Sequence, residues 1–229
     1  MSNWELGAAQ EFDRWQLSGR ADGMAEGHRY GTEAILNQWS LNSESRILDV
    51  GCGQGWLVHQ LCKAGIALGV GVDISEEMIG HARRFASDHS QFLVSSASEL
   101  PFKANFFSHV ISIESLYYHT RPVDSLAEWH RITQVGGVLG VMVDLYGENK
   151  GSHAWVDALN IPVHLFSISD YLSLFEQAGW GNVRFQQIVD PRPVKPESDF
   201  VPTDYYPCYD DYCAFRHSGS LILTAEKLA

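Results

Sequence analysis

The chain has 229 residues, 45% hydrophobic and 19% charged, which is typical of a globular protein that holds one α/β domain with additions rather than two full domains. Its formal net charge of −12 argues against binding to a nucleic-acid backbone or an anionic membrane, because both need a basic surface. No apolar run approaches the roughly 20 residues that span a bilayer, the first residues lack the apolar centre of a secretory signal, and the four cysteines have no zinc-ligand spacing. A cytoplasmic protein with reduced thiols is therefore expected.

The first 45 residues are predicted to form a helical cap outside the sheet. Four apolar residues recur at helical spacing between residues 2 and 17: they are Trp4, Ala8, Phe12 and Trp15. A second helix is expected over residues 30–41. The segment between them, 19–29, is rich in glycine and charge, and loops of this kind carry function more often than packing.

A strand, a glycine-rich turn and a helix follow after residue 45. The apolar run 46–50 is followed by three glycines in alternate positions from Gly51 to Gly55, and then by an amphipathic segment. Glycines let the chain reverse tightly and let a ligand approach the backbone without a Cβ in the way. A second strand, 68–73, ends in Asp73, at the edge where an open α/β sheet binds its ligand. The Asp73 carboxylate there can accept hydrogen bonds from both hydroxyls of a ribose.

The rest of the chain alternates helices and strands. Strands are predicted at residues 91–95, 109–113, 134–144, 182–188 and 218–226, the last as a hairpin partner of the one before it. Helices are predicted at residues 76–87, 123–133 and 169–178. Two long connections without a clear period, 145–167 and 189–218, are typical of lids or substrate loops.

The sequence DVGCGQG from Asp49 to Gly55, with its spacing to Asp73, resembles the class I S-adenosylmethionine-dependent methyltransferases, in particular the ubiquinone and menaquinone biosynthesis branch. The resemblance implies a Rossmann-like three-layer α/β sandwich. Its seven-stranded sheet would be mostly parallel, with an antiparallel last strand and N-terminal cap helices. The whole chain, 1–229, would be one methyltransferase domain with a cap at 1–45 and a cofactor-binding core at 46–144.

The resemblance also implies a cofactor, S-adenosyl-L-methionine, which becomes S-adenosyl-L-homocysteine. It assigns ten residues to cofactor binding: Asp49, Gly51, Cys52, Gly53, Asp73, Ile74, Met78, Ser96, Ala97 and Glu114. Ser96 departs from the family pattern, which has an Asp that accepts from the adenine amino group. A serine hydroxyl can accept this hydrogen bond but carries no charge, so the binding free energy of the cofactor is expected to be about 1 kcal/mol weaker. Because the N-terminal segment covers the cofactor in this branch, Arg20, His28 and Arg29 are candidates to contact the cofactor carboxylate or the substrate.

Methyl transfer from a sulfonium is an in-line displacement that needs positioning and a dry pocket, and needs a base only if the acceptor arrives protonated. Candidates follow the fourth strand at the carboxyl edge, with His119, Glu114 and Tyr118 preferred over Tyr117 and Asp144. The histidines show neither HExxH nor another metal spacing, so no metal is predicted. The tyrosines between 205 and 212 suggest a planar or cationic acceptor, since aromatic faces attract cations.

The expected activity is methylation of a small molecule on O, N or C, with no nucleic-acid or membrane partner. The acceptor and the oligomeric state stay open. An alternative is a partner subunit or sensor that binds the cofactor without turnover. A nicotinamide-dependent oxidoreductase is disfavoured because the glycines follow GxGxG rather than the dinucleotide fingerprint.

Overall fold

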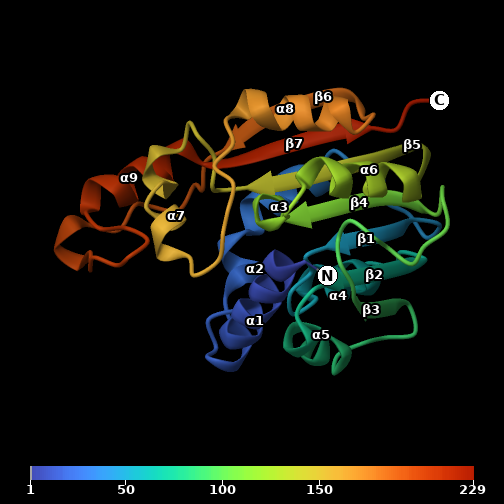
Figure 1. The fold of residues 1–229 in the computed structure, drawn as a ribbon, viewed down its shortest axis with the longest axis horizontal. Helices are drawn as coiled ribbons and strands as arrows, with labels where there is room; N and C mark the ends of the chain where they lie inside the picture. Colours follow the sequence, from blue (N-terminus) through green and yellow to red (C-terminus); the bar gives the residue numbers. More distant parts are fainter. Residues whose placement is uncertain (1) are drawn as a thin grey trace.

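A computed structural model describes residues 2–229 and contains one seven-stranded sheet (Figure 1). Its strands are β1 (Arg46–Val50), β2 (Leu68–Asp73), β3 (Ser90–Val94), β4 (Phe107–Ile113), β5 (Thr133–Val143), β6 (Gly181–Ile188) and β7 (Ser220–Glu226). They are arranged in the order β3-β2-β1-β4-β5-β7-β6, and β7 alone runs antiparallel to the other six strands. The predicted fold, including the antiparallel last strand and its pairing with the strand before it, is confirmed.

Helices cover both faces of the sheet and one of its ends. They are α1 (Asn3–Leu17), α2 (Met24–Gly27), α3 (Arg29–Leu36), α4 (Trp56–Lys63), α5 (Glu76–Arg83), α6 (Pro122–Ile132), α7 (Trp155–Ala158), α8 (Ile168–Gln177) and α9 (Tyr209–Ser218). Successive side chains of a strand point to opposite faces. Ile47 of β1 therefore packs in a cluster with residues of α3 and α4, whereas Leu48 packs in a second cluster with residues of α6 and α8. The result is the expected three-layer sandwich.

Some predicted boundaries were wrong. The second cap helix ends at Leu36, not at residue 41, although Trp39 and Leu41 still pack against the core cluster of Ile35. Apolar spacing thus continued past the end of the helix. The segment 189–218 contains the ten-residue helix α9, which we did not predict because aromatic and polar residues alternate along it. Acids in its first turn and bases in its last turn, which suit the helix dipole, were the available signal.

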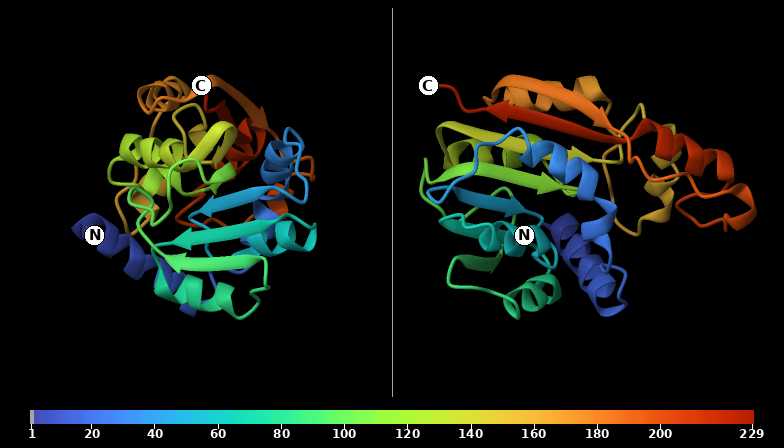
Figure 2. Two further views of the ribbon diagram at one scale, coloured as in Figure 1. Left: turned by 90° about the vertical axis from the view of Figure 1, so that its right-hand side faces the viewer. Right: turned by 180° about the vertical axis from the view of Figure 1, so that it is seen from behind.

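The end of the sheet toward which the parallel strands point is covered by the cap and by the two long connections (Figures 1 and 2). Segments 145–167 and 189–218 pack on each other there: a Cβ added at Gly151 would lie 2.1 Å from the backbone nitrogen of Phe215 in α9. The cap helix α1 is tied to α5, since the Ser75 hydroxyl donates to Asp13. The cap and the two connections therefore enclose the carboxyl edge of β1, β2 and β4.

Among the helices of residues 2–229, none is both long and apolar enough to cross a membrane.

Candidate functional site

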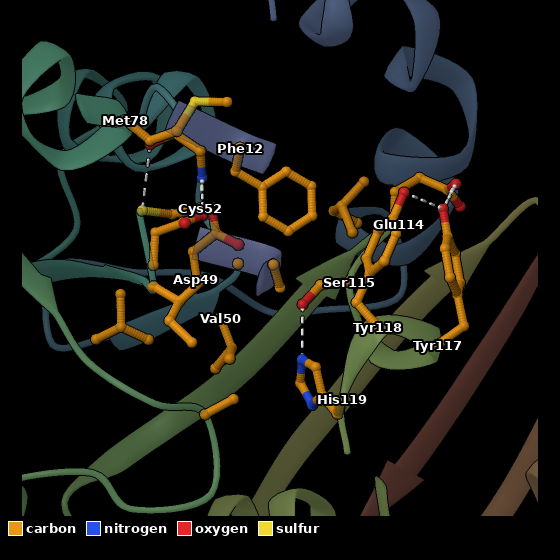
Figure 3. Close-up of a pocket in the computed structure, with 18 of the residues that line it drawn as sticks. Phe12, Asp49, Val50, Cys52, Met78, Glu114, Ser115, Tyr117, Tyr118 and His119 are labelled. Carbon is orange, nitrogen blue, oxygen red and sulfur yellow. Dashed lines mark hydrogen bonds between the residues drawn. The ribbon is translucent and has the colours of Figure 1, made fainter. Parts of the chain in front are cut away.

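A cavity of about 510 Å³ lies at this edge, and its lining has two parts (Figure 3). The glycine-loop half is formed by residues 49–54, by Asp73, Ile74 and Met78, and by residues 95–98. The aromatic half is formed by Phe12, Trp15, Tyr117, Tyr118, Trp155 and Tyr205. Figure 3 shows Asp49 and Cys52 on one side and Glu114, Tyr117 and Tyr118 on the other, with Phe12 between them. The cavity is thus polar where the motif lies and aromatic where the cap and the long connections close over it.

The glycine loop is held close to the strand ends. Gly51 has φ +75°, and its N–H donates to the carbonyl of Val72 at 2.8 Å. A Cβ at Gly51 would lie 2.4 Å from the Ser115 hydroxyl oxygen, so only glycine fits without a shift. Cys52 is 4% exposed, and its thiol packs in the core cluster of α4 and α5. The backbone of Cys52 is also engaged, since its N–H donates to the carbonyl of Val72 and its carbonyl accepts from the N–H of Gly55, so Cys52 offers a ligand contact surface only.

Asp73 and Asp49 place two carboxyl groups at the glycine-loop half. Asp73, at the end of β2, accepts from the N–H groups of Gly53 and Ser75, each at 2.9 Å. Burial raises the pKa of Asp73, although these hydrogen bonds oppose the rise. Asp49 is 3% exposed, and burial together with the charge of Asp73 raises its pKa to about 8. Among residues 2–229, no Lys or Arg forms an ion pair with Asp49. The carboxyl of Asp49 therefore suits a cationic ligand group that would favour its charged form.

The structure shows a carboxylate near Ser96 that our sequence analysis missed. The Ser96 hydroxyl donates to Glu5 of α1, and the other carboxylate oxygen of Glu5 accepts from the N–H of Ser2 at 2.6 Å. Glu5 and Ser96 both line the cavity. A carboxylate, the group that the resemblance led us to expect at position 96 itself, thus reaches this position from the cap helix. A sequence signal existed, because Ser2 and Glu5 form a capping box, but nothing in the spacing linked α1 to residue 96.

The remaining cofactor candidates also line the cavity. Ile74 follows Asp73, and Met78, only 2% exposed, packs with Ala8 and Trp15 of α1. The carbonyl of Ala97 accepts from the indole N–H of Trp129 at 3.0 Å. Nine of the ten candidates thus gather at the glycine-loop half.

Glu114 lies apart from this group. It follows β4 with φ 52°, a conformation that costs a non-glycine residue about 1 to 3 kcal/mol and is found at functional sites. Its carboxylate accepts from the Tyr117 hydroxyl at 2.7 Å and from the backbone N–H of Asp144. Burial and the charge of Asp144 raise the pKa of Glu114 well above its usual range. Glu114 therefore faces the end of β5 rather than the glycine loop.

The other two catalytic candidates occupy different surroundings. The Nε2 atom of His119 lies 2.9 Å from the Ser115 hydroxyl, and burial lowers the pKa of His119 to about 4. Its imidazole is therefore neutral at neutral pH. Tyr118 packs edge-on against Phe12 with ring centroids 5.0 Å apart, and burial raises the pKa of its hydroxyl. Tyr118 thus belongs to the aromatic half, and His119 to the wall between the halves.

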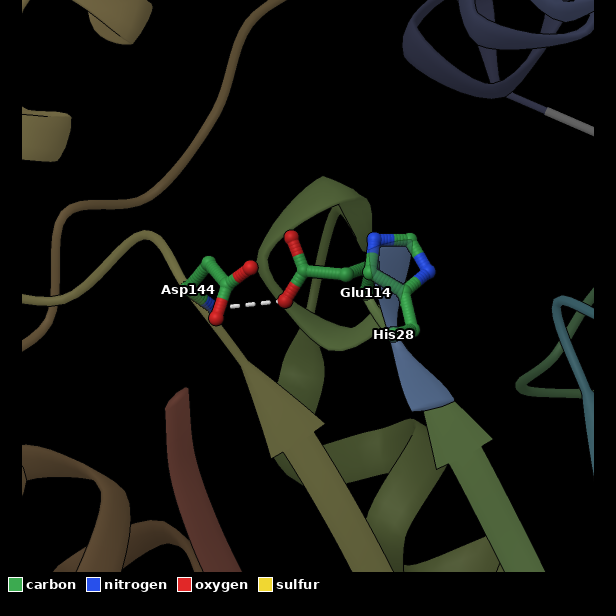
Figure 4. Close-up of side chains that lie close together, drawn as sticks. All are labelled: His28, Glu114 and Asp144. Atoms are coloured by element: carbon green, nitrogen blue, oxygen red, sulfur yellow. Dashed lines mark hydrogen bonds between the residues drawn. The ribbon is translucent and has the colours of Figure 1, made fainter. Parts of the chain in front are cut away.

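Of the three candidates from the cap loop, two reach the cavity. The Arg20 guanidinium lies between Trp15 and Tyr205, at 4.0 and 4.6 Å from the ring centroids, and donates to the Tyr205 hydroxyl. His28 lines the cavity beside Glu114 (Figure 4). Arg29 lies outside the lining and forms exposed ion pairs with acids of its own segment. Arg20 therefore ties the cap to the connection 189–218.

Residues 48–141 match the family described as "Methyltransferase domain". The chain is also similar to sterol 24-C-methyltransferase erg6 of Aspergillus fumigatus, with 27% identity over 200 residues, 81% of this chain and 50% of that protein. The ubiquinone/menaquinone biosynthesis C-methyltransferase UbiE of Coxiella burnetii is 29% identical over 122 residues, half of this chain and 49% of that protein. The chain thus spans about half the length of these curated relatives, and the similarity to UbiE agrees with the branch that the motifs suggested.

Among solved structures, the complex between the Haloferax volcanii Trm112 methyltransferase activator and the putative methyltransferase contains a similar chain. The two chains are 30% identical, superpose with a TM-score of 0.86, and align over 96% of this chain and 98% of that one. Geranyl diphosphate C-methyltransferase from Streptomyces coelicolor, solved with S-adenosyl-L-homocysteine, shares the fold at 17% identity and a TM-score of 0.66, over 90% of this chain and 82% of that one.

Proposed function

This chain belongs to the S-adenosylmethionine-dependent methyltransferases, and we propose that it transfers the methyl group to a small molecule with an aromatic or apolar body. The cavity carries this proposal. Its acceptor side is the aromatic half, which lies under the cap and the connections 145–167 and 189–218. An acceptor in that half is surrounded by side chains, which suits a small molecule better than a residue on a macromolecule. The net charge of −12 also disfavours a nucleic-acid acceptor.

The residues of the glycine-loop half fit the cofactor. We assign the Asp73 carboxylate to the ribose hydroxyls and the Asp49 carboxyl to the ammonium of the methionine part, since Asp49 is buried without an ion-pair partner among residues 2–229. The open side of Gly53, where a Cβ would meet only Met78 at 3.9 Å, admits the ligand to the backbone. We assign Ser96 and Glu5 together to the adenine amino group. Ile74, Met78 and Ala97 line the adjoining wall.

When bound, S-adenosylmethionine supplies an electrophilic methyl group on its sulfonium. The chain positions the reactants and excludes water. Phe12 and Tyr118 pack edge to face in the aromatic half, and Arg20 holds the cap against the connection 189–218. Well-oriented reactions gain roughly 7 to 11 kcal/mol from positioning alone. Glu114 and His119 remain our candidates for accepting a proton, whereas the raised pKa of Tyr118 keeps its hydroxyl protonated and leaves it as a hydrogen-bond donor to the acceptor. With its pKa lowered to about 4, His119 is a weak base, so Glu114 is the stronger candidate.

The test is a calorimetric titration with S-adenosylmethionine and S-adenosylhomocysteine, followed by incubation with methyl-labelled cofactor. The labelled reactions contain cell extract separated into small-molecule, RNA and protein fractions. We expect micromolar binding and label in the small-molecule fraction. Label confined to RNA or protein would refute the acceptor class, whereas binding without any transfer would favour the sensor or partner subunit.

A second candidate is that the enzyme works with a small activator subunit. The observation in its favour is the similarity over nearly the whole chain to a methyltransferase solved with Trm112. Mixing the purified chain with Haloferax volcanii Trm112 and following the complex by size-exclusion chromatography tests this directly. We expect co-elution and tighter cofactor binding; separate elution at micromolar concentration with unchanged cofactor affinity would argue against it.

A further inference from the structure

Three side chains of metal-binding type meet at the carboxyl edge of the sheet, although they are far apart in the sequence. His28 lies between α2 and α3, Glu114 follows β4 and Asp144 follows β5. One donor atom from each lies within 4.8 Å of the other two. In Figure 4, Glu114 stands between Asp144 and His28. The topology thus gathers one imidazole and two carboxylates that no linear spacing could reveal.

Asp144 has an unpartnered oxygen inside this cluster. The residue is 7% exposed, and its Oδ1 atom is buried without a hydrogen-bond donor. Among residues 2–229, no Lys or Arg forms an ion pair with Asp144 or Glu114. Buried carboxylates are normally hydrogen-bonded, paired with a cation or bound to a metal. A cation is therefore the group that this cluster lacks.

Glu114 is held in one orientation by its neighbours. Its backbone is in the left-handed region, the Tyr117 hydroxyl donates to one carboxylate oxygen, and the Asp144 N–H donates to the other. Each oxygen keeps a further lone pair. Hydrogen bonds of this kind orient metal-binding carboxylates in known sites. The strained residue thus presents a fixed carboxylate to the cluster.

We propose that His28, Glu114 and Asp144 bind a divalent transition-metal ion such as Mn²⁺, Fe²⁺ or Zn²⁺. An imidazole with two carboxylates suits these ions, whereas Mg²⁺ prefers oxygen ligands alone. Metal-ligand bonds of about 2.0 to 2.2 Å require donors about 3 to 3.5 Å apart, so the three groups draw closer on binding. The imidazole of His28 would make most of this shift, because it lies at the junction of two short helices of the cap, whereas Glu114 and Asp144 follow strands of the sheet.

The use of this ion in catalysis rests on the proposed function, and with the ion bound Glu114 is a ligand rather than the proton acceptor. His28 and Glu114 line the cavity, so an ion that they bind would be accessible to the acceptor. The acceptor class is then a small molecule whose oxygens can ligate a metal, such as a hydroxyl beside a carbonyl or beside a second hydroxyl. The ion would fix that group relative to the cofactor, a positioning role.

The experiment uses the full chain after removal of metals with a chelator. Mn²⁺ is titrated in, and free Mn²⁺ is followed by its electron paramagnetic resonance signal, with Zn²⁺ as competitor. We expect one Mn²⁺ per chain, displaced by Zn²⁺. Asp144→Asn and His28→Ala should each weaken binding at least about tenfold, since loss of groups that merely orient ligands already costs 10- to 100-fold. The exposed Asp157→Asn is the control and should bind as the wild type does.

Absence of stoichiometric Mn²⁺ binding by the wild type, or equal affinity in His28→Ala, overturns the site. His28→Ala carries the test if Asp144→Asn fails to fold, because the imidazole lies on the cap rather than on the sheet. Calorimetry with S-adenosylhomocysteine on the same samples separates this proposal from the proposed function. Cofactor binding and methyl transfer without Mn²⁺ binding refute the metal site alone, while Mn²⁺ binding without methyl transfer supports the site and refutes the activity.

Discussion

The two halves of the cavity are built in different ways. The glycine-loop half comes mainly from strand ends and the turns that follow them, between residues 49 and 98. The aromatic half is assembled from the cap, the turn after β4, and the connections 145–167 and 189–218. One half therefore depends on local backbone geometry and the other on contacts between distant segments. Substitutions should separate them, because damage to the first acts on cofactor affinity and damage to the second on stability and acceptor binding.

The largest effect is expected at Asp73. Asp73→Ala should weaken S-adenosylhomocysteine binding by roughly 2 to 4 kcal/mol, because charge-assisted bonds to two ribose hydroxyls are lost and the Gly53 N–H loses its acceptor. Calorimetry measures the change, and the exposed Asp88→Ala serves as control. Unchanged affinity would mean that the ribose binds elsewhere.

Gly151→Ala tests the aromatic half. The added Cβ would lie 2.1 Å from the backbone nitrogen of Phe215, so α9 must shift, and we expect a loss of about 1 to 3 kcal/mol in the free energy of unfolding. Gly80→Ala is the matched control: nothing lies within 4 Å of its Cβ position, and alanine in α5 should stabilise the helix by up to about 1 kcal/mol. Cofactor affinity should be unchanged in both variants. A large loss of cofactor affinity in Gly151→Ala would show that the two halves of the cavity are not separable.

A smaller effect is expected at Glu5, where the cap meets the glycine-loop half. Glu5→Gln should weaken S-adenosylhomocysteine binding by about 1 kcal/mol, because the amide lacks the charge near Ser96. The analogue with unsubstituted purine in place of adenine, which lacks the amino group, should bind equally to wild type and variant. An equal loss for both ligands would place the adenine away from Glu5; Glu44→Gln, on an exposed residue, is the control.

The smallest effect concerns the attachment of α1. Burial tends to raise the pKa of Glu11, but hydrogen bonds from Arg14, Trp15 and Asn160 outweigh it and lower the pKa below 4.5. A carboxyl group whose pKa is lower in the folded than in the unfolded chain stabilises the fold at pH values above its unfolded pKa. This stabilisation is lost as the pH falls through the folded pKa. The wild type should therefore lose stability below about pH 4.5 more steeply than Glu11→Gln. Denaturant unfolding of both proteins at pH 6 and pH 4 measures this. An equal loss in the free energy of unfolding of the wild type and of Glu11→Gln would contradict the prediction.

The amino-acid sequence by itself determined the sheet, its single antiparallel strand and the glycine-loop half. Short apolar runs, glycines at fixed offsets and an acid at a strand end act through local geometry, so their positions can be recognised along the chain. Only the tertiary structure decided the rest: that Glu5 lies against Ser96, that Glu114 turns away from the glycine loop, and that His28 reaches Asp144. These contacts join segments that share no spacing, and they exist because burying the cap and α9 against the sheet brings distant side chains together.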